Sequence, residues 1–167
     1  MWSWKFPPKI KIFLWQICSG CLPTRTNLQS RRVDCSNQCG LCGDPGESLT
    51  HIFMTCSVAK EAWSTVSWKW TTQGGNDFLE QVGKKFHVKR KEDLAKLIWG
   101  CWAIWGERNC RVWQQASSPA RQFMLKAEAF MTGWAQAQTA RREGRLAGLR
   151  MVASWCCPAA GGGETEC

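Results

Sequence analysis

The sequence Cys39-Gly40-Leu41-Cys42, followed by His51 and Cys56, decides the fold of the first part of this chain. Its spacing is C-x2-C-x8-H-x4-C, so three thiols and one imidazole fall within eighteen residues. Structural zinc sites hold the metal tetrahedrally with four such ligands, at Zn–S distances of about 2.3 Å. We therefore predict a closed structural Zn²⁺ site with no open position for chemistry. The alternative is four unrelated buried side chains.

The residues around the four ligands fit a compact loop. Gly40 and Gly43 allow a tight turn that aims both sulfurs of the first pair at one point, because glycine adopts positive φ without steric cost. Asp44-Pro45-Gly46 is typical of a turn that returns the chain to the first pair. Residues 47–55 are expected to form a short helix that carries His51 and ends at Cys56.

Other cysteines offer competing interpretations. Cys18-Ser19-Gly20-Cys21 is a second C-x2-C pair, but it lies at the C-terminal end of a predicted helix, whereas the helix dipole lowers a thiol pKa at the N-terminal end. We expect it to serve packing, with a redox role or a contribution to zinc as alternatives. Cys35 lies four residues before Cys39 and could replace it as a ligand. His87, between two basic runs, is expected at the surface, and the remaining cysteines have no metal spacing.

Length and composition limit the class of protein. A chain of 167 residues suits one ordinary domain or two small ones. Eleven cysteines would fit a secreted disulfide scaffold, but the N-terminus does not resemble a signal peptide, because lysines interrupt every apolar run. No run of eighteen apolar residues is present, so no membrane span is expected. We expect an intracellular protein, in the nucleus rather than the cytoplasm.

Basic residues dominate the charge. The net charge is +9, and the first 33 residues hold six basic side chains and no acidic one. This asymmetry is typical of proteins that bind nucleic acid, although a solvated basic face is the alternative. RNA or DNA, single-stranded or structured, is therefore the expected partner, and the oligomeric state stays open. The predicted contacts are Lys5, Lys9, Lys11, Arg25, Arg31 and Arg32 to phosphates, and Trp4 by stacking on bases.

Hydrophobic periodicity predicts a mainly α fold: a small zinc-knuckle module flanked by short helices, then a helical segment and a disordered tail. The expected units are residues 2–70, 76–150 and 151–167, with Gly74-Gly75 at the first boundary. Helices are expected over residues 8–19, from a Thr24 cap to Arg31-Arg32, after Ser57, over 77–86 with Asn76 as cap, over 92–113, and from Ser118 until fraying near Gly144.

The first of these helices shows the pattern most clearly. Ile10, Phe13, Leu14 and Ile17 recur at helical spacing and form an apolar stripe. Ile12 and Trp15 widen that stripe, so we expect this helix to be buried on more than one side.

At this level of detail the chain resembles a known family. Residues 4–15, with Trp4-Lys5 and Pro7-Pro8-Lys9-Ile10-Lys11-Ile12-Phe13-Leu14-Trp15, look like the opening of the plant reverse-transcriptase zinc-binding domain. The resemblance covers roughly residues 2–70 and is carried further by Leu22-Pro23-Thr24, Asn27-Leu28, Arg31-Arg32-Val33, Cys39-Gly40-Leu41-Cys42-Gly43, Glu47-Ser48-Leu49-Thr50-His51-Ile52-Phe53 and Cys56-Ser57-Val58-Ala59-Lys60-Glu61-Ala62-Trp63.

In that family the domain follows the polymerase of non-long-terminal-repeat retrotransposon polyproteins. Ile98-Trp99, Trp102-Ala103-Ile104-Trp105 and Glu107-Arg108-Asn109 resemble the helical segment that precedes an RNase H-like domain, and Trp155-Cys156-Cys157-Pro158 resembles its last residues. With zero Tyr, the Tyr-x-Asp-Asp signature of the polymerase cannot be present, and no carboxylate cluster of RNase H is seen. We therefore expect no enzyme activity and a truncated or domesticated fragment.

Two functions fit this resemblance. The first is a zinc-stabilised nucleic-acid-binding module, for which the family implies element RNA or nicked target DNA as ligand. The second is a structural or protein-interaction element that braces the polymerase against an RNase H-like domain, with Trp99, Trp102 and Trp105 as its docking face. A fragment with no working function is the remaining alternative.

Overall fold

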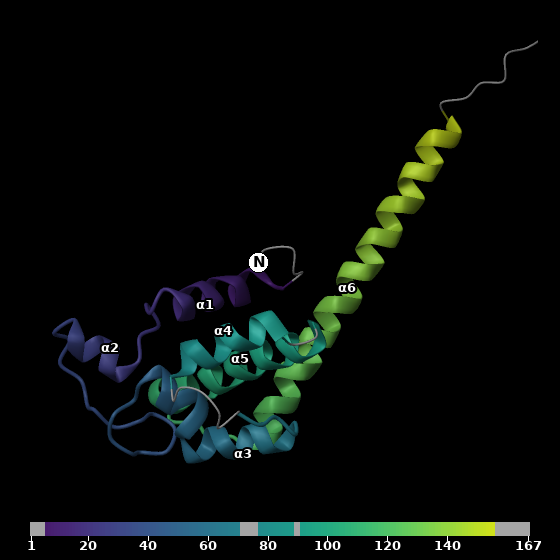
Figure 1. The fold of residues 1–167 in the computed structure, drawn as a ribbon. Coiled ribbons are helices and arrows are strands. Elements are labelled where there is room, and N and C mark those ends of the chain that lie inside the picture. The colour runs from purple at the N-terminus through teal and green to yellow at the C-terminus, as the bar shows by residue number, and fades with distance from the viewer. Residues whose placement is uncertain (1–5, 71–76, 89–90, 156–167) are drawn as a thin grey trace, which may run out of the picture.

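The computed structural model describes residues 6–70, 77–88 and 91–155, and it is mainly α-helical, as the sequence predicts (Figure 1). Within those ranges, β pairing is limited to an isolated bridge between Gln38 and Pro45. The elements in chain order are α1 (Pro8–Cys18), α2 (Arg25–Ser30), the wide helical turn η1 (His51–Thr55), α3 (Ser57–Thr65), α4 (Phe78–Val88), α5 (Lys91–Gln114) and α6 (Ala120–Trp155).

Helix α1 confirms the predicted stripe but not its width. Pro8 opens the helix, where the missing proline N–H costs no hydrogen bond, and Ile10, Phe13 and Ile17 are buried. Ile12 and Trp15, however, are 58% and 55% exposed, so the prediction that the helix is buried on more than one side is wrong. The buried side of α1 packs mainly against α5, with Phe13 also touching Phe53 of η1, and a periodic pattern cannot tell how many sides of a helix have neighbours.

Helices α2 and α4 begin at the position that the sequence predicts or one residue later. Thr24 caps α2, because its hydroxyl accepts a hydrogen bond from the Asn27 N–H at 3.3 Å. Asn76, the predicted cap of α4, lies outside the described residues. The carboxylate of Asp77 accepts hydrogen bonds from the N–H groups of Leu79 and Glu80, so it caps that helix.

Helices α5 and α6 form the largest helix pair. The predicted inner face of α5 is confirmed, since Leu94, Leu97, Ile98, Cys101, Ile104 and Trp105 are all buried. Helix α6 runs to Trp155, so the prediction of fraying near Gly144 is wrong, and residues 151–155 of the predicted tail are helical. One glycine costs a helix only about 1 kcal/mol, which the surrounding strong helix formers offset. Figure 1 shows the C-terminal part of α6 extending away from the other helices. Residues 156–167 lie outside the described part.

One hydrophobic core joins the zinc-ligand region to the later helices. Trp63 of α3 donates a hydrogen bond to the Phe53 carbonyl at 2.7 Å, and its ring packs against Gly100 of α5. A Cβ at Gly100 would lie 2.6 Å from Cη2 of Trp63, so only glycine fits there. Residues 74 and 75, the predicted boundary between units, lie outside the described residues, and the division into units stays a prediction.

The predicted tryptophan docking face is part of the packed interior. Trp99 and Trp105 are buried in the core, and half-buried Trp102 stacks on Phe130 of α6 with ring centroids 5.4 Å apart. The prediction that these indoles form an exposed docking face is therefore wrong, because other side chains cover them: Phe130 of α6 stacks on Trp102, and the Arg108 guanidinium lies over Trp105. Among the described helices, none combines the length and apolar content that a bilayer crossing requires.

Candidate metal centre

The structure brings together the four residues that the sequence predicts as zinc ligands. One ligand atom from each of Cys39, Cys42, His51 and Cys56 lies within 4.8 Å of the others, and Cys42 Sγ is 3.2 Å from His51 Nε2. A tetrahedral zinc site with bonds near 2.0–2.3 Å has ligand atoms about 3.5–3.8 Å apart. The donor set and its spacing therefore fit Zn²⁺ with only small movements.

The first ligand pair lies on a tight turn. The N–H of Gly43 donates to the Cys39 carbonyl at 2.9 Å, and Gly43 has φ of 82°, a value that favours glycine. The N–H of Leu41 points at Cys39 Sγ at 3.4 Å. Such N–H groups stabilise negative charge on a sulfur, so this turn prepares Cys39 to bind a metal as a thiolate.

The second ligand pair depends on the width of η1. The Cys56 N–H donates to the His51 carbonyl at 2.8 Å, a bond that spans five residues instead of four. In an α-helix, residues five apart point about 140° away from each other, whereas the wider turn rotates them closer together. His51 Nε2 faces the cluster and Nδ1 lies 3.4 Å from the Thr55 hydroxyl. A metal at Nε2 requires the proton on Nδ1, where Thr55 accepts it.

The thiols of the cluster perturb one another. A hydrogen bond with Cys56, together with burial, holds the pKa of Cys39 far above its ordinary value, and the same bond lowers the pKa of Cys56. Burial raises the pKa of Cys42. Without metal, protons therefore stay on Cys39 and Cys42 at neutral pH, and a divalent cation that binds there must displace them.

The competing cysteines do not join the site. Cys18 and Cys21 lie at the end of α1 and in the turn after it, and the Cys21 thiol points at the Ser19 carbonyl at 3.4 Å. Cys35 faces the Arg25 carbonyl instead. In the part of the chain that the structure describes, the cluster of four is therefore the one group with metal-binding geometry, and none of the cysteines there forms a disulfide.

A buried ion pair, which the sequence analysis did not identify, anchors the ligand loop to α5. Glu47 is fully buried and accepts two hydrogen bonds from Arg108, at 2.7 Å from Nη2 and 3.2 Å from Nε. Its two oxygens also accept the backbone N–H groups of Gly40, at 2.7 Å, and Arg25, at 3.0 Å. One carboxylate thus joins the first ligand turn, the start of α2 and α5.

Arg111, one helical turn beyond Arg108 on α5, makes a second connection. Its Nη1 donates to the Leu41 carbonyl at 2.7 Å, within the first ligand turn, and its Nε donates to Glu107 at 2.9 Å. Glu107 also accepts the Ser118 N–H at 2.7 Å, at the start of the α6 region. In the sequence, the Glu-Arg-Asn motif at residues 107–109 is the signal that could have predicted these buried ion pairs. Charged residues inside an otherwise apolar helix face need buried partners.

The predicted nucleic-acid contacts are dispersed. Arg31 and Arg32 are exposed after α2, Arg25 and Lys11 are half-buried, and Lys5 and Trp4 lie outside the described residues. The ammonium of Lys9 lies over the rings of α5 and α6, at 4.1 Å from the Phe130 centroid and 4.8 Å from that of Trp102. Lys9 therefore has a packing role on α1, and its contact with phosphate stays a prediction.

Comparison with known proteins agrees with the geometry. Residues 1–63 match the family described as zinc-binding in reverse transcriptase. A protein of Arabidopsis thaliana named "Putative ribonuclease H protein" is 27% identical over 66 residues, which span 40% of this chain and 11% of the relative. No solved structure matches the chain. Residues 1–63, which include all four predicted zinc ligands, are thus similar to the zinc-binding region of reverse transcriptases.

Proposed function

We propose that this chain is a zinc-stabilised nucleic-acid-binding module derived from a retrotransposon reverse transcriptase, and that it binds RNA or DNA with unpaired or structured strands. The observation that carries the proposal is the Cys₃His cluster, with all ligand atoms within 4.8 Å, next to a short helix and loop that expose arginines. Cys39, Cys42, His51 and Cys56 would hold the zinc, whose part is to fold the loop, because four protein ligands leave no open position.

The net charge of the zinc centre indicates that phosphate would bind to the basic residues around it and not to the metal itself. Three thiolates and a neutral imidazole around Zn²⁺ carry a net charge of about −1, so the metal centre itself does not attract phosphate. Arg31 and Arg32 are exposed directly after α2, and the chain as a whole carries +9. The attraction to a polyanion therefore comes from the basic residues that the folded loop presents.

The names of the similar proteins support the same class of partner. Reverse transcriptases and ribonuclease H proteins both act on nucleic acid, which supports nucleic acid as the class of partner. The chain covers only about a tenth of the length of the Arabidopsis relative.

A bracing role between polymerase and RNase H-like domains is the second candidate. The extension of α6 away from the other helices favours it, because this helix offers a long surface for a neighbouring domain (Figure 1). Burial of Trp99 and Trp105 argues against the tryptophan face first expected for this role. The two candidates differ in one measurable property, salt-dependent binding to nucleic acid.

The test is a salt titration of RNA binding by the zinc-loaded chain. Six phosphate contacts predict that log K falls with log salt with a slope of about −4, at roughly −0.7 per contact on a single strand. The double variant Arg31→Ala, Arg32→Ala should reduce the slope by about 1.4, whereas Arg121→Ala on α6 should leave it unchanged. A zinc-loaded, folded chain without salt-dependent binding would refute the proposal and favour the bracing role.

A further inference from the structure

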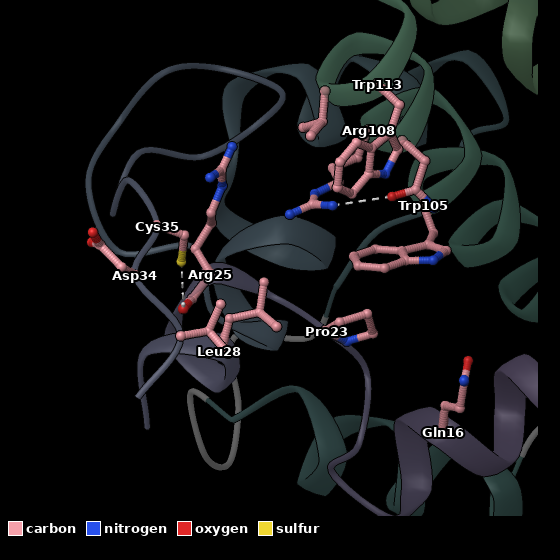
Figure 2. A pocket seen from close by; sticks show the side chains of 12 residues that line it. Gln16, Pro23, Arg25, Leu28, Asp34, Cys35, Trp105, Arg108 and Trp113 are labelled. Carbon is pink, nitrogen blue, oxygen red and sulfur yellow. Dashed lines mark hydrogen bonds between the residues drawn. The ribbon is translucent and has the colours of Figure 1, made fainter. Parts of the chain in front are cut away.

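A groove of about 580 Å³ lies between α2 with the loop that follows it and the C-terminal half of α5 (Figure 2). Its volume falls within the range of 300–1,000 Å³ that is usual for ligand pockets. Figure 2 shows Trp105 and Trp113 on one side, Arg25, Leu28 and Cys35 on the other, and the Arg108 guanidinium between them. The groove is separate from the four predicted zinc ligands, none of which lines it.

Arg25 gives the groove an unsatisfied cation. Its Nε–H is buried and finds no hydrogen-bond partner among the described residues, although its backbone N–H is bonded to Glu47. Arg108 differs, because Glu47 and Asn109 already accept its hydrogen bonds. Asp34 also lines the groove, but its carboxylate points outward at the edge in Figure 2. A phosphate in the groove would supply the counter-charge that the Arg25 guanidinium lacks among the described residues.

Trp113 gives the groove an open aromatic surface. Its side chain is 77% exposed near the end of α5, which is unusual for the largest apolar side chain. Trp105, two turns earlier on α5, is 9% exposed and has the Arg108 guanidinium over its ring at 4.9 Å. The ring of Trp105 is thus already in contact with Arg108, whereas the exposed ring of Trp113 can stack on a flat ligand.

We propose that this groove binds one unpaired nucleotide of a single-stranded nucleic acid, with the base stacked on Trp113 and a phosphate held by Arg25. Flat π surfaces and phosphate oxygens occur side by side in every nucleotide, and stacking on exposed aromatics is how proteins hold single strands. Exposed Arg31 and Arg32, just before the loop that lines the groove, would hold the next phosphates. This inference rests on the proposed function, and it adds the position on the protein at which the strand binds.

The first test measures affinity of the zinc-loaded full chain for a fluorescently labelled oligouridine RNA. Trp113→Ala should raise Kd roughly 5- to 150-fold, the loss expected for one stacked base. Trp15→Ala is the matched control, because Trp15 is also more than half exposed but lies on α1 outside the groove. Arg25→Ala should reduce the salt slope by about 0.7, and Arg25→Lys, which keeps the charge, should not.

The second test locates the base directly. An oligonucleotide carrying 5-iodouridine is irradiated on the protein, and cross-linked tryptic peptides are mapped by mass spectrometry. Residues 112–121 form one such peptide, in which Trp113 is the single aromatic side chain. A cross-link in that peptide supports the proposal. RNA binding that Trp113→Ala leaves unchanged, with cross-links elsewhere, would overturn the groove but not the proposed function. Absence of any salt-dependent binding by the parent chain would overturn both.

Discussion

Replacing Glu47 by alanine should destabilise this protein more than any exposed substitution. Glu47 is fully buried, and its carboxylate accepts four hydrogen bonds: two from Arg108 and one each from the N–H groups of Gly40 and Arg25. The change would leave the Arg108 guanidinium, which is 3% exposed, without its counter-charge. The loop that carries the first zinc-ligand pair would lose its attachment to α5 at the same time.

The expected cost follows from these contacts. Breaking a buried ion pair by removing one partner costs about 3–5 kcal/mol, because the remaining charge is buried and uncompensated. Each backbone N–H left without an acceptor would add about 1–3 kcal/mol if water could not replace the carboxylate. Since alanine leaves space for water, we expect a total of about 4 kcal/mol. That loss is a large part of the 5–15 kcal/mol by which domains are stable.

Urea unfolding of the zinc-loaded protein measures this loss. Glu61→Ala, an exposed glutamate on α3, is the control and should stay within about 0.5 kcal/mol of the parent. The double variant Glu47→Leu, Arg108→Leu should cost much less than the two single changes added together, because it leaves no unpaired charge. A cost below about 1 kcal/mol for Glu47→Ala, or additive costs in the double variant, would refute the role of this pair.

Three further predictions follow from the site and the core. Cys42→Ser should abolish stoichiometric zinc in protein purified under reducing conditions, whereas Cys18→Ser should keep it; elemental analysis measures both. Zinc affinity should rise by at least about two log units per pH unit near neutrality in competition titrations, because the raised pKa values of Cys39 and Cys42 require the metal to displace a proton from each. An affinity independent of pH would contradict this. Gly100→Ala should cost about 1–3 kcal/mol in urea unfolding, since its Cβ would overlap the ring of Trp63; an unchanged midpoint would contradict it.

Short-range features of this protein could be predicted from the sequence. The zinc ligands are two pairs, three and five residues apart, so local turn chemistry largely determines which atoms within each pair can meet. The same holds for the Thr24 cap and for the inner face of α5, where periodicity alone predicts the buried side chains. Periodicity did not predict which apolar side chains of α1 are buried. Ile12 and Trp15 extend the apolar pattern of this helix, but no neighbouring element covers them.

Only the tertiary structure decided the long-range partnerships. Glu47 and Arg108 are 61 residues apart in the chain, and neither residue type by itself indicates a partner at that distance. The position of Lys9 over Phe130, and the groove between α2 and α5, likewise arise from how helices pack. The physical reason is the same in each case. Local spacing determines which groups can share a turn, whereas the side chain that meets a buried charge depends on the elements that exclude water around it.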